Sequence, residues 1–143
     1  MIECKVAIAA ATAITDIRSN QISFIQILED MEVMSFPAVL STVSMVFILG
    51  RSAEDPNTSP ARLTVNCGGS VILEQPVTIE FGDNLRNRLT FDMSGLPLIA
   101  PGKLSFSLAD ATGRQIGSYE LMVTSKINVV TKSDHKTPTI IQS

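Results

Sequence analysis

The chain has 143 residues, of which 45% are hydrophobic, 5% aromatic and 17% charged, and its formal net charge at pH 7 is −3. This length suits one domain with an ordinary core. The composition excludes a disordered chain, a disulfide-dense mini-protein and a general basic nucleic-acid binder. Because an average soluble domain is roughly 25% charged, the surplus of aliphatic over charged residues needs an explanation.

The first fifty residues contain strand patterns that are apolar on both faces. A strand of this kind is expected to be buried on both faces, whereas a plain two-sheet sandwich buries only one face of each strand. A loop, the C-terminal tail, a second copy or a partner is therefore expected to cover the second face. The residues on that second face, which we predict at a protein interface, are Ile25, Ile27, Val46 and Ile48.

Between these strands, residues 29–34 fit one short helix. Glu29, Asp30 and Glu32 form the only acidic cluster in the sequence. We interpret the cluster as a solvated turn, and the alternative is a site for a cation or a basic partner.

The second half of the chain alternates with a period of two, which is typical of strands with one buried face. Turn residues separate the runs, and the clearest case is a hairpin of 103–109 with 118–123 across a turn at 110–113. Short strands with turns at this density predict an all-β fold. We expect an antiparallel β-sandwich of about seven to nine strands, Ig-like or C2-like, over residues 1–123.

Residues 124–143 are rich in Lys, Thr and Ser. They are expected to form either a frayed polar tail or a strand-adding arm that pairs with a sheet edge of this chain or of a neighbour. In the second case Val129 and Val130 would join the protein interface.

Residues suited to catalysis or to metal binding are sparse. The only histidine, His135, falls in the predicted tail and makes a poor general base. Cys4 and Cys67 are too far apart in sequence for a zinc motif and are expected to be buried free thiols. No catalytic, cofactor-binding or metal-binding residues are predicted, so we expect no enzyme and no cofactor.

Ligands other than protein have weak support in the sequence. Arg86 and Arg88 could contact phosphate, but Asp83 is close and no aromatic platform is present, so no nucleic-acid partner is expected. The apolar stretch 33–49 is too short and too polar for a membrane span. A small-molecule ligand is not expected, and the best candidate, calcium, would use single loop acids: Asp16, Glu54, Asp55, Asp83 and Asp110.

Several features are shared with a known family. They include Ala9-Ala10-Ala11 in an early apolar strand, a polar turn at 16–20, Ser35-Phe36-Pro37-Ala38 before the strand at 43–49, and the terminal hairpin. With these features the run from 4 to 123 resembles a bacterial family of small cytoplasmic β-sandwich domains that has no assigned function. The resemblance implies a bacterial or phage-type source and a binding or assembly role, and it transfers no site residues.

Taken together, these patterns predict a non-catalytic, cytoplasmic protein-interaction or assembly module. Its partner is a second copy of the chain or another subunit of a larger complex. The alternative is a β-sandwich that binds calcium, lipid or carbohydrate through its end loops.

Overall fold

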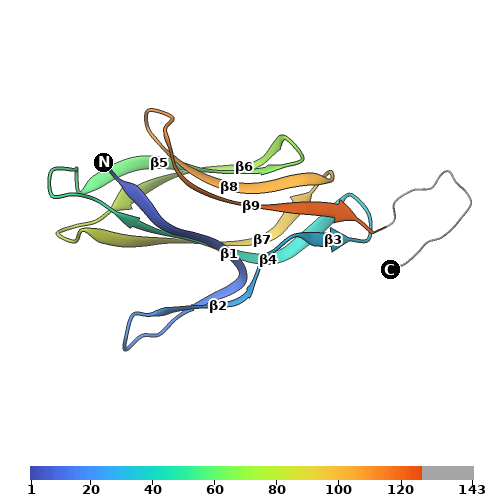
Figure 1. Cartoon of the computed structure of the whole chain (residues 1–143), viewed down its shortest axis with the longest axis horizontal. Helices are drawn as coiled ribbons and strands as arrows, with labels where there is room; N and C mark the ends of the chain where they lie inside the picture. Colours follow the sequence, from blue (N-terminus) through green and yellow to red (C-terminus); the bar gives the residue numbers. More distant parts are fainter. Residues whose placement is uncertain (127–143) are drawn as a thin grey trace, which may run out of the picture.

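The computed structural model describes residues 1–126, and over this range the chain forms nine β-strands and no helix (Figure 1). The all-β prediction is confirmed. The strands are β1 (Glu3–Thr15), β2 (Ile22–Ile27), β3 (Met31–Val33), β4 (Ala38–Gly50), β5 (Thr58–Cys67), β6 (Ser70–Glu80), β7 (Arg86–Leu98), β8 (Gly102–Asp110) and β9 (Gln115–Ser125).

Two sheets pack face to face as a sandwich (Figure 1). The strand order is β2-β1-β4-β7 in one sheet and β3-β9-β8-β5-β6 in the other. The runs β1-β4-β7 and β9-β8-β5-β6 have the order of strands A-B-E and G-F-C-C′ in immunoglobulin domains. All strand pairs are antiparallel except β3 with β9, which is parallel. The predicted antiparallel sandwich is therefore confirmed, with an Ig-like order and one parallel edge pair.

The short helix predicted at 29–34 is wrong, because this segment contains strand β3. Met31 and Val33 pack against the core, and the segment lies in register with Val123 to Ser125 of β9. The Asp30 carboxylate accepts a hydrogen bond from the backbone N–H of Met122 at 2.8 Å. Tertiary contacts along the edge of β9 thus hold an extended backbone here, where local sequence also permitted a helix.

The main core lies between the inner faces of the two sheets. Its largest fully buried side chains include Phe47 and Met45 of β4, Leu63 of β5 and Phe106 of β8. The predicted C-terminal hairpin is confirmed as β8 and β9, with Leu104 opposite Leu121. Strand β9 continues to Ser125, two residues into the predicted tail. Val129 and Val130 lie outside the described residues.

The main departure from a plain sandwich is a β-hairpin that folds over the outside of the four-stranded sheet. Strand β1 pairs with β4 from Glu3 to Ala10, and beyond that point it pairs only with β2. Residues 11–27, which we call the flap, run back beneath β4 and β7 on the side away from the five-stranded sheet (Figure 1). The flap thus gives the four-stranded sheet a cover on its outer face.

Candidate functional site

The outer face of the four-stranded sheet carries apolar side chains from β1 and β4. Strand register places Val46 between Ile8 of β1 and Thr90 of β7. Two residues further along β4, Ile48 is paired with Arg88 of β7. These residues alternate with Met45 and the other core residues of β4, so they point away from the main core. This is the second apolar face that the sequence predicts.

Arg88 joins this face to the flap. Its Nη2 donates a hydrogen bond to the backbone oxygen of Asn20 at 2.8 Å, and its Nη1 lies 3.5 Å from Thr15 Oγ1. Ile22 is paired with Thr15, and Phe24 follows two positions later, so both side chains lie on the face of the flap that meets the sheet. The flap therefore covers the sheet with apolar residues of its own.

The flap separates the predicted interface residues into two groups. Val46 has 0% of its surface exposed and Ile48 is partly buried, because both lie on the covered outer face of β4. Ile25 and Ile27 lie on β2 and remain 47% and 46% exposed. The second face of β4 is thus covered by the flap of the same chain. The apolar surface that another molecule could contact lies on the flap itself.

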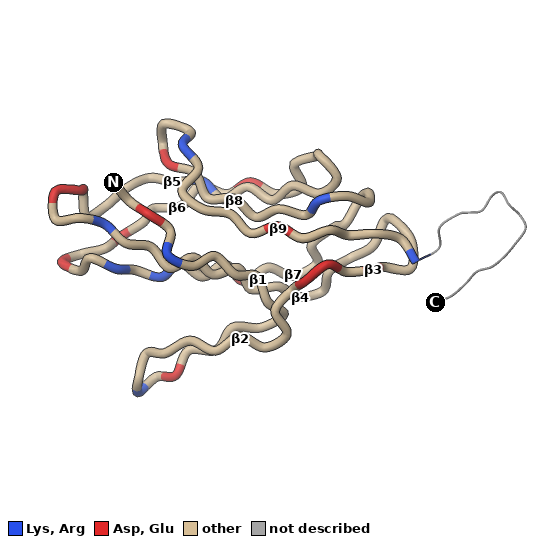
Figure 2. The backbone as a smooth tube through the Cα atoms, in the orientation of Figure 1, with Lys and Arg blue, Asp and Glu red and all other residues tan. Residues whose placement is uncertain are grey.

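The exposed face of the flap includes two further isoleucines that were not predicted at an interface from the strand pattern. Ile14 is 49% exposed on β1, and Ile17 is 97% exposed in the turn between β1 and β2. Ile17 interrupts a polar turn, and that contrast is the sequence signal that could have identified it. The only charged residues between positions 11 and 27 are Asp16 and Arg18 in the turn, so the two strands of the flap carry no charge (Figure 2).

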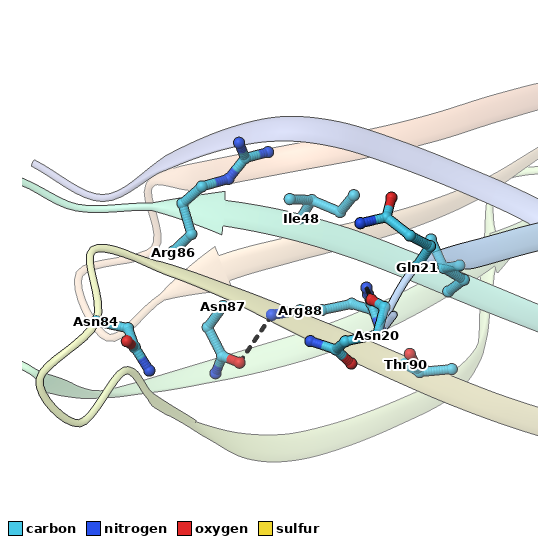
Figure 3. Close-up of a pocket in the computed structure, with 9 residues that line it drawn as sticks. Asn20, Gln21, Ile48, Asn84, Arg86, Asn87, Arg88 and Thr90 are labelled. Carbon is cyan, nitrogen blue, oxygen red and sulfur yellow. Dashed lines mark hydrogen bonds between the residues drawn. The ribbon is translucent and has the colours of Figure 1, made fainter. Parts of the chain in front are cut away.

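A polar hollow of about 620 Å³ opens between the turn of the flap and the start of β7 (Figure 3). Ile48 contributes an apolar wall. The polar side chains around the hollow come from segments more than sixty positions apart in the sequence: Asn20, Gln21, Asn84, Arg86, Asn87, Arg88 and Thr90. The sequence shows Arg86 and Arg88 but gives no sign that Asn20 and Gln21 lie across from them.

The residues with shifted pKa values make structural contacts. A hydrogen bond from the Met1 ammonium group at 2.6 Å, assisted by the Ser52 backbone N–H, lowers the pKa of Asp55 to about 2. Hydrogen bonds, first of all from the Thr112 hydroxyl, lower the pKa of Asp110. Burial raises the pKa of the Cys4 thiol, which makes it a poorer nucleophile at neutral pH.

Calcium is only the best candidate for a ligand that the sequence does not favour, and three of its five candidate loop acids accept hydrogen bonds within their own turns. Asp16 accepts from the Arg18 N–H at 2.8 Å, as Asp55 and Asp110 do within their loops. Within residues 1–126, no three His, Cys, Asp or Glu side chains come together in a way that could hold a metal ion. His135 lies outside the described residues. Cys4 and Cys67 are free thiols, and Cys67 is fully buried.

Comparison of the chain with protein-family models and with curated proteins finds no match. Over the described part of the chain, no helix is long and apolar enough to cross a membrane. Two surfaces are the candidate functional sites of the described residues: the exposed face of the flap and the hollow beside its turn.

Proposed function

We propose that this chain is a non-catalytic protein-interaction module that assembles through the flap. The observation that supports the proposal is the exposed face of the flap, where Ile14, Ile25 and Ile27 are each about half exposed on two uncharged strands. Single exposed apolar residues are ordinary on protein surfaces, but isoleucines grouped on one projecting hairpin are typical of a contact surface.

Burial of these isoleucines against a partner would supply a substantial part of the free energy of association. Complete burial of one aliphatic side chain contributes about 1.5–3 kcal/mol, and half of that surface is still available on each of these isoleucines. Strand β2 is also an edge strand, because within residues 1–126 it pairs only with β1. A partner could therefore combine side-chain burial with backbone hydrogen bonds along β2.

The partner that we propose is a second copy of the chain, and a different subunit of a larger bacterial or phage-type assembly is the other form of the same function. A reducing, cytoplasmic location is part of the proposal. It is supported by the two free cysteines and by the resemblance to a cytoplasmic bacterial family.

Light scattering at micromolar concentration tests the self-association. We expect the wild-type chain to have a mass well above the 15.4 kDa of one copy, and the double variant Ile25→Asp, Ile27→Asp to return to that mass. Val71→Asp is the matched control, because Val71 is an exposed aliphatic residue of β6 in the other sheet. A wild-type chain that is monomeric at these concentrations contradicts self-association, and dissociation by Val71→Asp would assign the contact to another surface.

A further inference from the structure

We propose that the hollow beside the flap binds the phosphate group of a small organic phosphate monoester. This site is separate from the exposed face of the flap, so it does not depend on the proposed assembly function. It also changes the expectation from sequence that no small-molecule ligand binds, because the structure places the flap turn across from Arg86 and Arg88.

The charge of the hollow is positive in an acidic chain. Arg86 and Arg88 line it, no Asp or Glu does, and the chain as a whole has a net charge of −3. Within residues 1–126 neither arginine forms an ion pair with a carboxylate. The nearest acids on the same segments do not line the hollow. Asp16 in the flap turn accepts a hydrogen bond from the Arg18 N–H at 2.8 Å, Asp92 accepts one from Ser44 Oγ at 2.6 Å, and Asp83 lies in the loop before β7.

Donor groups that lack partners surround the same space. The Nη1 and Nη2 atoms of Arg88 point to the flap, and its Nε is buried without a hydrogen-bond partner among the described residues, so Arg88 contributes to the hollow mainly through its charge. No hydrogen bond within residues 1–126 involves the side chains of Asn20, Gln21 and Asn84. Figure 3 shows Asn84 and Arg86 toward one end of the group and Asn20 and Gln21 toward the other.

Two of the neighbouring contacts show that the site is held in place. Asn87 accepts the N–H of Arg88 through its side-chain oxygen at 2.8 Å and donates to the Glu80 backbone oxygen at 2.6 Å. Arg88 is itself tied to the flap through the Asn20 oxygen at 2.8 Å. A guanidinium that is already positioned loses less freedom when it binds an oxyanion.

The class of ligand follows from charge and size. A phosphate monoester carries a charge of about −1.5 to −2 at pH 7 and three strong acceptor oxygens, which matches two arginines and several amide donors better than a single carboxylate does. A volume of about 620 Å³ lies within the usual range of small-molecule sites and leaves room for an organic group beside the phosphate. Ile48 offers that group an apolar contact.

Titration of the full chain with ribose 5-phosphate, followed by calorimetry and by backbone amide chemical shifts, tests the site. We expect saturable binding, with the largest shifts at Asn20, Arg86 and Arg88. Inorganic phosphate should bind more weakly, and ribose should not bind. Absence of saturable binding up to on the order of 10 mM overturns the proposal, as does binding of succinate at equal strength, which would indicate a carboxylate site instead.

Two variants and a control locate the binding. Arg86→Gln and Arg88→Gln should each weaken the binding of ribose 5-phosphate by at least about tenfold, because each removes one fixed charge. Arg62→Gln on β5 removes the same charge from the other sheet and should change binding by less than about twofold. Arg88 also holds the flap, so Arg86→Gln is decisive. Arg86 is exposed and its side chain makes no hydrogen bond within the described residues, and unchanged binding in this variant overturns the proposal.

Discussion

Individual side chains on the outer face of the four-stranded sheet show how an apolar residue outside the main core becomes fully buried. Val46 lies between Ile8 and Thr90 and does not belong to the main cluster between the sheets. Val46 is nevertheless 0% exposed, and we infer that the flap shields it on this outer face. Val46 thus contributes to the stability of a single chain, independent of any partner.

This burial predicts the effect of truncating Val46. Val46→Ala should lower the free energy of unfolding by about 1–3 kcal/mol, since it removes two buried methyl groups and leaves a cavity. Urea denaturation followed by circular dichroism measures the change. Val39→Ala on the exposed face of the same strand is the control and should stay within about 0.5 kcal/mol. Equal effects of the two substitutions would mean that the flap does not pack on β4.

Tyr119, the only tyrosine of the chain, connects β9 to the segment that follows the flap. Its hydroxyl donates a hydrogen bond to the backbone oxygen of Leu28, just after the flap. Burial, and then the negative charges of Glu29 and Asp30, raise the pKa of Tyr119 above the ordinary 10.0. The Tyr119 hydroxyl should therefore ionise at higher pH in the folded chain than in the chain unfolded in urea.

The sign of the linkage follows from that shift. The Tyr119 contribution to stability is complete below pH 10 and is lost as the pH rises through the higher pKa of the folded state. Because the chain contains no Trp, absorbance at 295 nm follows this one group. Identical titration curves for the folded and unfolded chains would contradict the environment described for Tyr119.

At the scale of elements, the flap depends on a bend where β1 leaves β4. Gln26 lies near this bend with φ +58°, in the left-handed region that side chains other than glycine enter at a cost of about 1–2 kcal/mol. It sits between Ile25 and Ile27, which pair with Thr12 and Ala10 across the hairpin. We infer that this residue helps to turn the flap back beneath the sheet.

Glycine substitutions test the bend. Gln26→Gly should relieve the left-handed strain, whereas Ser23→Gly in the same strand should only add backbone freedom to the unfolded chain. We therefore expect the free energy of unfolding to be about 1–2 kcal/mol more favourable for Gln26→Gly than for Ser23→Gly, measured by urea denaturation. Equal losses in the two variants would show that the bend at Gln26 carries no strain.

At the scale of the whole molecule, the sheets approach each other closely where β1 crosses β9. A Cβ atom added at Gly117 would lie 2.6 Å from the Sγ of Cys4 and 2.7 Å from its Cβ. Real Cβ atoms do not come this close to other heavy atoms, so Gly117 allows the first strand to close one end of the sandwich. The contact spans the sequence from Cys4 to Gly117 and links the two sheets.

Overpacking at this point should be costly. Gly117→Ala is expected to lower the free energy of unfolding by about 1–3 kcal/mol, because β1 and β9 must move apart. The double variant Cys4→Gly, Gly117→Ala should recover most of the loss, since it removes both clashing atoms. Thermal or urea denaturation measures both values, and a loss that the double variant does not reduce would place the strain elsewhere.

The strands of the second half could be predicted because their pattern is local. Successive residues of a strand face opposite sides, so burial of one face appears directly as alternation in runs such as Leu104, Phe106 and Leu108. The same rule fails at residues 29–34, where the three-residue strand β3 is too short to show a period. Its extended form depends on the edge of β9, more than ninety positions away.

The all-β class, the C-terminal hairpin and the second apolar face of the early strands follow from local residue patterns. What covers that face, and which residues meet around the hollow, depend on contacts between distant parts of the chain. The hydrogen bond from Arg88 to Asn20 joins positions 68 residues apart, and no local period reports such a contact. The alternation of apolar and polar residues indicates which side of a strand is buried, but it does not indicate which other segment packs against that side.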